Sequence, residues 1–539
     1  MNKMKKFASM AAAILMTACV AVPTTMSLTA SAADITINGI STTQEHTFEV
    51  YQIFTGDLSN GKLSNLKWGS GVESIKKDEI TNWTATNGQT VSDDVVTYLT
   101  SANDARDIIK NITLSKTKAC EDVTAKNSDS VTISNLVDGY YVVKDVTNLS
   151  AKDDANSAWI VQVAGDDVAV EIKNAKPTVD KQVLDEEGDA EKGHANGWGE
   201  SADHAINEQF KFKLIANVPA KSDKDMKAYK EYKLKFNDTM SDGVTFENIE
   251  SVKIKNGNED ITLNSTEYSE DATSATEKAG LKWSLTIEDI INKLTAENGG
   301  VWGTNDLEVE VIYNAHLNEN AVISNGNVEN SNAINNNKVD LEYSNNPDST
   351  GAGGTNSTGK TPEDYVWVFT YEVDNTKYKN AIKGGNELEG AKFKLYDSTG
   401  TNEIKLIYDD TLTAYRPIKT GETATEMESA KTTGKFDIKG LDSGAYWLKE
   451  ISAPEGYNKC ADIEIKIDAS HEEVSDGAKV SMTLSSDSNM KNDVINKEGS
   501  SLPSTGGIGT TLFYVCGGAM VAVSGIFLIT KKRMDKNKD

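Results

Sequence analysis

Three polar side chains of reactive type lie on the inward faces of predicted β-strands. Lys181, Asp238 and Asn345 each fall in a segment where apolar residues occupy every second position. Side chains alternate across a strand, so the three share a face with these neighbours: Val179, Val183, Tyr232, Leu234, Phe236, Val339, Leu341 and Tyr343. Buried polar groups without partners are costly, so we predict that the three meet in one core.

Burial would change how the lysine and the carboxyl group ionise, because it lowers the pKa of a lysine and raises that of a carboxyl group. A neutral Lys181 amine can attack the side-chain amide carbon of Asn345. A protonated Asp238 would donate a hydrogen bond to the amide oxygen and carry protons between the groups. The product is an intramolecular Lys–Asn isopeptide bond, with ammonia as the leaving group. The alternative is a lysine that reaches solvent beside a hydrogen-bonded asparagine.

A second set of the same kind lies nearer the C-terminus. Lys377, Glu450 and Asn496 each lie on the apolar face of a predicted strand. Lys379 lies on the same face as Lys377, and we favour Lys377 by its distance from the strand-like segment 388–396. A bond between Lys377 and Asn496 would join the first and last strands of a domain. It would restrict the unfolded chain as a disulfide does.

Cysteine usage is low for a chain of several domains, which would ordinarily carry disulfides if it were exported. Cys19 and Cys516 lie in the terminal apolar segments, which leaves Cys120 and Cys460. Isopeptide bonds would take the place of disulfides. The segment 139–145 (GYYVVKD) has a similar strand pattern, but no lysine and asparagine partners can be named for it. We therefore predict that the N-terminal domain carries no crosslink.

The C-terminus carries a short motif, an apolar span and a basic tail. The motif consists of Leu502, Pro503, Ser504, Thr505 and Gly506. Residues 508–530 carry no charge, and a helix of this length crosses a bilayer. The cations that follow would stay on the cytoplasmic side. The alternative is an ordinary tail-anchored protein in which the pentapeptide occurs by chance.

The N-terminus is typical of a secretory signal peptide. A cationic start and an apolar segment precede Ala30-Ser31-Ala32, a small-residue cleavage site, so residues 1–32 would be removed. The alternative is lipidation at Cys19, although Met16 fits a lipobox poorly. The net charge of −27 argues against a nucleic-acid partner, which needs basic surface. The five histidines show no metal-ligand spacing, and we expect no metal, no cofactor and no conventional enzyme.

The remaining chain reads as an all-β protein of three tandem immunoglobulin-like β-sandwich domains. We predict them at 33–175, 176–350 and 362–500, with a flexible Gly/Ser/Thr loop or linker at 351–361 and the motif, apolar span and basic tail at 502–539. Short helical insertions are predicted at 93–112 and 287–294, where apolar residues recur at helical spacing.

Several segments carry a resemblance to one family. Residues 446–457 (YWLKEISAPEGY) and 388–396 (LEGAKFKLY) resemble strands of collagen-adhesin B modules. Residues 232–246 and 341–347 resemble the isopeptide-forming middle domain of fimbrial subunits, and 46–57 is similar to their first domain. Together with LPSTG, these segments resemble the sortase-assembled backbone pilins of Gram-positive bacteria. In that family a sortase cuts between the Thr and the Gly of the motif, here Thr505 and Gly506.

The resemblance also implies an acceptor lysine at the end of the first domain. Lys173 stands at that place, although Glu171 and Ile172 replace the family's Tyr-Pro pair. Lys176 is the competing acceptor. The resemblance implies a pilus backbone subunit in the cell wall, joined head to tail to identical subunits. Expected partners are pilus-type and wall-anchoring sortases, peptidoglycan, and tip and base pilins. The alternatives are a singly anchored adhesin or ancillary pilin and a wall-anchored hydrolase.

Overall fold

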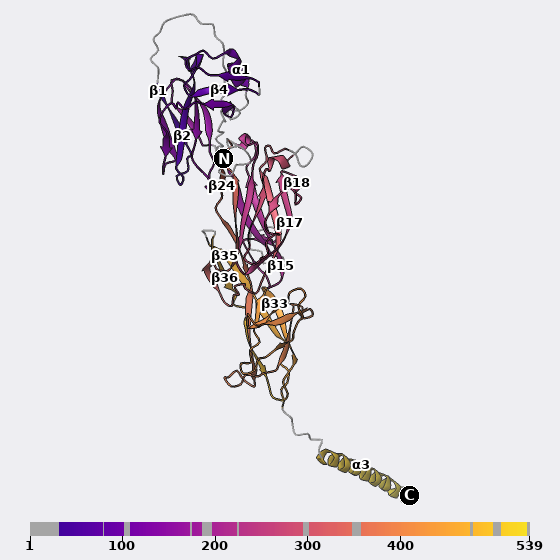
Figure 1. Cartoon of the computed structure of the whole chain (residues 1–539). Coiled ribbons are helices and arrows are strands. Elements are labelled where there is room, and N and C mark those ends of the chain that lie inside the picture. Colours follow the sequence, from indigo (N-terminus) through magenta and orange to yellow (C-terminus); the bar gives the residue numbers. More distant parts are fainter. Residues whose placement is uncertain are drawn as a thin grey trace. The chain divides into compact units, whose positions relative to one another are not determined.

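The structure, a computed structural model, describes residues 32–535 except 79, 102–107, 173–174, 186–196, 224–225, 295–300, 348–356, 475–477 and 500–507. The predicted signal peptide therefore lies outside the described residues. The chain divides into two compact units. The first contains residues up to Tyr371 together with 440–443 and 469–485, and the second contains the remainder. Strands make up about half of the described chain and far outnumber helices, which confirms the predicted all-β class (Figure 1).

The N-terminal region is built around a sheet whose two faces are both buried. Its strands are β2 (His46–Ser59), β3 (Lys62–Trp68), β7 (Val123–Ala125), β9 (Gly139–Asp145) and β10 (Ala158–Val163). In β9, Tyr140 and Val142 pack into one core, whereas Tyr141 and Val143 pack into another. A strand covered on both faces needs such a continuous apolar run. This burial explains the pattern of the segment 139–145.

Two smaller sheets supply residues to these cores. One contains β1 (Ala32–Asn38), β8 (Ser130–Val137) and β11 (Val168–Glu171). The other contains β4 (Val72–Lys76), β5 (Asn82–Thr84) and β6 (Ile112–Leu114). Helix α1 (Asp93–Ser101) packs with the second sheet through Val95 and Leu99. The helix begins where the sequence predicts, and Ile112, the predicted end, lies in a strand instead.

The middle sandwich is formed by a six-stranded and a seven-stranded sheet. The first contains β12 (Thr178–Leu184), β13 (Trp198–Gly199), β15 (Gln209–Val218), β17 (Val244–Asn256), β18 (Glu259–Thr262) and β21 (Leu307–Leu317). The second contains β14 (Ser201–Asp203), β16 (Leu234–Met240), β19 (Ser269–Glu270), β20 (Lys282–Ile287), β23 (Asn335–Ser344), β24 (Thr358–Lys360) and β25 (Asp364–Phe369). Along β16 every second residue is buried, as a strand covered on one face requires.

The predicted linker at 351–361 does not separate two sheets. Residues 351–356 lie outside the described chain, and β24 beyond them pairs with β23. β25, which the sequence assigns to the third domain, also pairs with β23. Its Asp364 carboxylate accepts a hydrogen bond from the Lys181 backbone N–H at 2.6 Å. The middle sandwich therefore extends past the predicted boundary, because β25 completes its second sheet.

The second unit is built largely from two five-stranded sheets, which we call the C-terminal sandwich. One contains β26 (Tyr371–Lys379), β29 (Leu406–Asp409), β30 (Ala414–Pro417), β32 (Ile438–Leu441) and β37 (Lys491–Asn496). The other contains β27 (Lys392–Tyr396), β28 (Glu403–Ile404), β31 (Met427–Glu428), β33 (Gly444–Ser452) and β34 (Ile463–Ile467). Its first and last strands, β26 and β37, are neighbours and run parallel, with Lys377 opposite Val494.

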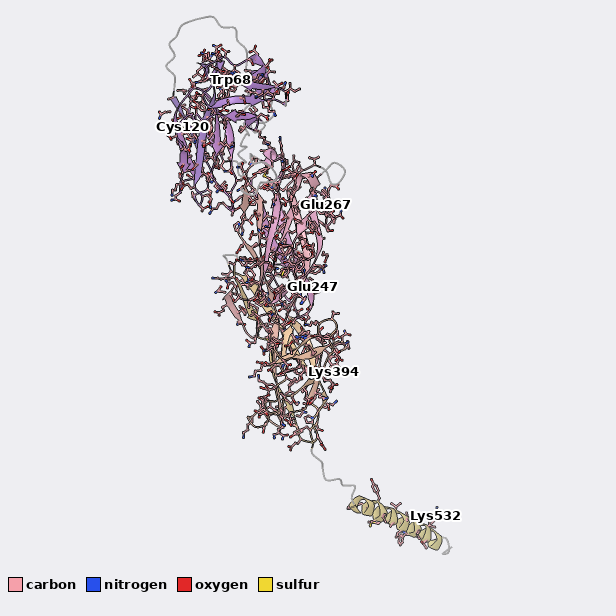
Figure 2. The ribbon with its side chains drawn as sticks, in the orientation of Figure 1. Trp68, Cys120, Glu247, Glu267, Lys394 and Lys532 are labelled. Atoms are coloured by element: carbon pink, nitrogen blue, oxygen red, sulfur yellow. The ribbon has the colours of Figure 1, made fainter. Side chains whose placement is uncertain are left out.

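The remaining elements are short, apart from one long helix. A three-stranded sheet contains β22 (Val328–Ser331), β35 (Ala469–Glu473) and β36 (Val480–Leu484). Two 3-10 turns are η2 (Met226–Ala228) and η3 (Ile291–Lys293), so the predicted helix at 287–294 is a single turn. Helix α3 (Ile508–Asp535) contains the segment Phe513–Lys532, which is long and apolar enough to cross a membrane. Its side chains, Lys532 among them, project away from the helix on all sides (Figure 2).

Candidate functional site

The first predicted lysine lies in the core of the middle sandwich. Lys181 is on β12, and its side chain is fully buried. Asp238 on β16 is also buried, and one of its carboxylate oxygens contacts the Lys181 amine. Because β12 and β16 belong to the two facing sheets, this contact crosses the middle of the sandwich. The structure therefore brings these two predicted residues together.

A buried tyrosine and a buried asparagine complete this cluster. The Lys181 amine donates to the hydroxyl of Tyr313 at 3.1 Å, and that hydroxyl donates to Asp238 at 3.1 Å. The side-chain amide of Asn337 donates to the same hydroxyl at 2.5 Å. Tyr313 and Asn337 are both fully buried. One oxygen of Asp238 and the amide oxygen of Asn337 have no hydrogen-bond partner.

Burial sets the ionisation of the cluster. It lowers the pKa of Lys181, against the opposing influence of the neighbouring Asp238. It also raises the pKa of Asp238, against the opposing influence of Lys181 and of the hydrogen bond from Tyr313. Both shifts favour uncharged groups, as expected for a dry core. A neutral amine is a nucleophile, and a protonated carboxyl group is a hydrogen-bond donor.

Asn345 does not belong to this cluster, and the predicted Lys181–Asn345 pairing is corrected here. Its side-chain amide donates to the backbone oxygens of Leu149 and Asp154, at 3.0 and 3.1 Å, in the N-terminal region. Asn337 and Asn345 lie eight residues apart along an extended strand, which is about 26 Å at the usual rise. Asn345 therefore lies far from Lys181, whereas Asn337 contacts the Tyr313 hydroxyl of the Lys181 cluster.

The second predicted set meets inside the C-terminal sandwich. Lys377 on β26, Glu450 on β33 and Asn496 on β37 are all buried. The Lys377 amine donates to the amide oxygen of Asn496 and lies 3.5 Å from a carboxylate oxygen of Glu450. The amide nitrogen of Asn496 donates to the same Glu450 oxygen at 2.7 Å. All three predicted residues are in mutual contact.

The surroundings of this cluster are apolar on one side and polar on the other. The ring of Phe393 lies 5.3 Å from the Lys377 amine. The second oxygen of Glu450 accepts a hydrogen bond from the Cys460 backbone N–H at 2.7 Å. Burial lowers the pKa of Lys377, which favours the neutral amine. The alternative lysine, Lys379, is only partly buried and pairs in register with Asn496 across the strands.

The N-terminal region has a buried charged cluster centred on a histidine. His46 is fully buried between Asp145, at 2.9 Å, and Asp154, at 3.2 Å. Burial lowers its pKa, but the hydrogen bonds to the two carboxylates outweigh burial and raise the pKa to about 9. The imidazole is therefore charged at neutral pH. That this region carries no crosslink stays a prediction.

The sorting motif 502–506 and the predicted acceptor Lys173 lie outside the described residues. The competing acceptor, Lys176, contacts the Asp153 carboxylate and donates to the Asp153 backbone oxygen at 2.8 Å. Its side chain keeps 36% of its exposure. Lys176 is thus partly accessible but already engaged in an ion pair.

Tyr313 and Asn337 are the site residues that the sequence prediction missed. Asn337 has the same parity on β23 as Val339, Leu341 and Tyr343, so the alternation allowed it as well as Asn345. Tyr313 lies on the alternating strand β21, where an inward tyrosine is no different in pattern from an ordinary core residue. A search for every inward polar group on these strands would have included both.

Three sequence families match the chain. Residues 211–347 match the Gram-positive pilin backbone subunit 2, Cna-B-like domain, and 373–480 match the SpaA prealbumin-like fold domain. Residues 495–536 match the LPXTG cell wall anchor motif. Together these matches cover just over half of the chain. None of the curated proteins compared matches the chain significantly.

Solved structures of similar fold include backbone pilins. The T6 backbone pilin of Streptococcus pyogenes is 16% identical, with a TM-score of 0.50, covering 88% of this chain and 100% of that one. The major pilin SpaD of Corynebacterium diphtheriae is 17% identical, with a TM-score of 0.44, covering 87% and 98%. A C-terminal fragment of the major pilin GBS80 of Streptococcus agalactiae is 22% identical, with a TM-score of 0.40, covering 60% and 99%. At these identities the likeness to the T6 pilin supports the fold.

Proposed function

This chain belongs to the pilin backbone subunits of Gram-positive bacteria, and from that premise we propose that each copy of the chain forms two Lys–Asn bonds within itself. The protein is a secreted subunit that is processed by sortase, polymerised into a pilus and attached to the cell wall. It is a structural protein, and the chemistry proposed here occurs once in each cluster rather than in turnover.

The proposed bonds are Lys181–Asn337 in the middle sandwich and Lys377–Asn496 in the C-terminal sandwich. In each, the lysine Nζ forms a bond to the amide carbon of the asparagine, and the bond from that carbon to Nδ2 breaks. The acid, Asp238 or Glu450, transfers one amine proton to Nδ2, so that ammonia leaves and the acid is regenerated. The observation that carries the proposal is the contact of Lys377 with the Asn496 amide oxygen while Glu450 holds the amide nitrogen.

Intact mass spectrometry of the processed chain tests this proposal. We expect a mass lower than that of the sequence by two ammonia molecules. Asn337→Ala should abolish one loss, whereas Asn345→Ala should leave both. Asn496→Ala should abolish the other loss. A wild-type mass equal to that of the sequence would overturn the proposal. If Asn345→Ala abolished an ammonia loss and Asn337→Ala did not, the Lys181–Asn345 pairing would be correct instead.

We also propose that Lys173 of one subunit joins Thr505 of the next, head to tail. A sortase cysteine would hold Thr505 as a thioester after cleavage, and an accessible lysine amine would resolve it. The ion pair of Lys176 with Asp153 makes it the poorer acceptor. Repetition of one heterologous contact gives an open filament, and tip and base pilins would be joined to its ends.

Immunoblots of wall extracts in boiling detergent separate the outcomes. Lys173→Ala should collapse a high-mass ladder to monomer, and Lys176→Ala should leave it. The reverse result would move the acceptor to Lys176, and survival of the ladder in both variants would place it elsewhere. A wild-type extract with a single band would favour the singly anchored adhesin.

A further inference from the structure

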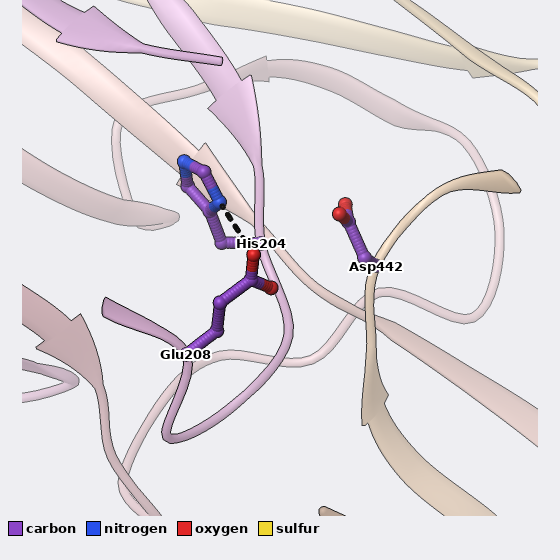
Figure 3. A group of neighbouring side chains, drawn as sticks. All are labelled: His204, Glu208 and Asp442. Carbon is purple, nitrogen blue, oxygen red and sulfur yellow. Dashed lines mark ion pairs between the residues drawn. The ribbon is translucent and has the colours of Figure 1, made fainter. Parts of the chain in front are cut away.

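A histidine and two carboxylates that belong to neither lysine cluster gather in the first unit. His204 directly follows β14, and Glu208 lies in the turn that leads into β15. Asp442 lies in the turn between β32 and β33, within the segment 440–443 that belongs to the first unit. One ligand atom from each residue lies within 4.8 Å of the others. Figure 3 shows the three side chains directed toward a common space.

The ring nitrogen that faces this space has no hydrogen-bond partner. The other nitrogen, Nε2 of His204, lies 2.8 Å from the backbone oxygen of Leu184, which can only accept. Nε2 therefore carries a proton, and in the neutral imidazole the lone pair is on Nδ1. Nδ1 is buried without a hydrogen-bond partner, and the residue is 4% exposed. Glu208 lies 3.9 Å away, which is too long for a hydrogen bond.

The position of the His204 ring is fixed from both sides. Its face stacks on Phe210 with ring centres 4.3 Å apart and an angle of 1° between the planes. The hydrogen bond to Leu184 holds its far edge. Metal-bound histidines are commonly oriented in this way, with the second nitrogen donating to a backbone oxygen. The ring is thus preorganised to present a lone pair.

The charge around the site also favours a cation. The carboxylates of Asp203, Glu208 and Asp185 lie close enough to that of Asp442 to repel it. Carboxylates that repel each other in this way are stabilised by a positive ion between them. Glu208 is exposed and Asp442 is half-buried, so an ion can enter from solvent. His204 and Glu208 also line a cavity of about 280 Å³, which leaves room for water ligands.

We propose that His204, Glu208 and Asp442 bind a divalent transition-metal ion of the Zn²⁺ type. One imidazole nitrogen and two carboxylate oxygens are a ligand set that Zn²⁺ accepts, with a fourth position open to water. Ca²⁺ and Mg²⁺ prefer oxygen alone, so the nitrogen selects against them. Ligands of one Zn²⁺ lie ~3.4 Å apart, so the carboxylates must move inward by about 1 Å. The exposed Glu208 and the turn of Asp442 permit that movement.

The sequence gives little sign of this site. His204 and Glu208 are four residues apart, but the third ligand follows more than 200 residues later. The expectation of no metal came from the spacing of the histidines along the chain. The fold brings the turn of Asp442 to the segment before β15, and the ion would tie these two segments together.

Equilibrium dialysis of the untagged, processed chain against ZnCl₂, after treatment with a chelator, tests the proposal. We expect one tightly held Zn²⁺ per chain that excess Ca²⁺ does not displace. His204→Ala and Asp442→Asn should each weaken binding at least tenfold. The matched control is His316→Ala, because His316 lies 2.8 Å from Glu247 but has no third ligand among the described residues. This variant should bind as the wild type does.

A spectroscopic measurement on the wild type guards against variants that do not fold. Co²⁺ in the same site should give visible absorption bands typical of a mixed nitrogen and oxygen ligand set, and Zn²⁺ should abolish them. Absence of stoichiometric binding in the wild type would overturn the proposal. Binding that survives His204→Ala, or that is lost equally in His316→Ala, would also overturn it.

Discussion

The two lysine clusters reach the same functional groups through different contacts. In the C-terminal cluster the acid, Glu450, accepts directly from the amide of Asn496. In the middle cluster the shorter acid, Asp238, contacts the amine, and Tyr313 links it to the amide of Asn337. A tyrosine hydroxyl thus supplies the reach that the aspartate lacks. The comparison teaches that a shorter acid with a bridging hydroxyl can connect the amine and the amide, as a longer acid does alone.

The clusters also differ in how well their polar atoms are satisfied before any bond forms. Both polar atoms of the Asn496 side chain have partners. In the middle cluster, by contrast, Asp238 Oδ1 and Asn337 Oδ1 have none. Both of these oxygen atoms can only accept a hydrogen bond when Asp238 is ionised. Protonation of Asp238 would add an O–H group that can donate. The middle cluster therefore depends more strongly on the protonated acid.

The largest expected effect comes from removing either acid. Asp238→Ala and Glu450→Ala should each retain the mass of one ammonia molecule and lower the free energy of unfolding of their own sandwich by about 4–5 kcal/mol, as for a disulfide that closes a loop of this length. Intact mass and calorimetry measure the two effects. Because the sites lie in different units, the double variant should show the sum, and a marked departure from additivity would contradict independent bonds.

The next effect concerns the buried histidine of the N-terminal region, His46. His46→Ala leaves two buried carboxylates without their cation and should cost about 3–5 kcal/mol. In the wild type, the pKa of His46 is about 9 when folded and 6.5 ordinarily. The stability from this protonation is complete below about pH 6.5 and is lost as the pH rises through about 9. Calorimetry across this range should show the loss, and a flat profile would contradict the raised pKa.

A smaller effect distinguishes the two clusters from each other. Tyr313→Phe removes the hydroxyl that joins Asp238 to Asn337, and the lost hydrogen bonds should slow formation of the middle bond about 10- to 100-fold. The C-terminal bond should form at its usual rate. Time-resolved mass spectrometry after refolding follows both. Tyr343→Phe is the matched control, because it removes a buried hydroxyl that contacts Asp153 instead. Equal slowing in both variants would assign the effect to general destabilisation.

The smallest effect is expected for the alternative lysine. Lys379→Ala should preserve both ammonia losses and change the stability by less than about 0.5 kcal/mol, because the side chain is only partly buried. Lys377→Ala should abolish one loss in the same assay. If Lys379→Ala removed the C-terminal bond, the assignment of the amine would be wrong.

The sequence predicted which residues face the core better than it predicted their positions along a strand. Alternation identified Lys181, Asp238, Lys377, Glu450 and Asn496 as inward groups that the structure brings into two clusters. It failed for Asn345, because a period of two gives the same face to Asn337 and fixes no position along the strand. Strand register depends on pairing with distant segments, which a single sequence does not reveal.

The same limit applies to larger features. The Gly- and Ser-rich segment 351–361 has the composition of a linker, yet β24 within it and β25 after it both pair with β23. Composition indicates only the local flexibility of a segment. The pairing of β25 depends instead on β23, a strand that lies earlier in the chain. His204, Glu208 and Asp442 come together for the same reason. Sites assembled from distant segments need the fold before they can be seen.

The parallel pairing of β26 and β37 has a mechanical consequence for a subunit inside a fibre. The chain enters the C-terminal sandwich at the start of β26 and leaves it at the end of β37, so tension pulls two parallel neighbours in opposite directions. The ladder is then loaded in shear, with its hydrogen bonds strained together rather than peeled one at a time. A covalent link between Lys377 and Asn496 would carry that tension across the ladder. The residues between them would then bear no tension, and they would stay folded while the fibre is stretched.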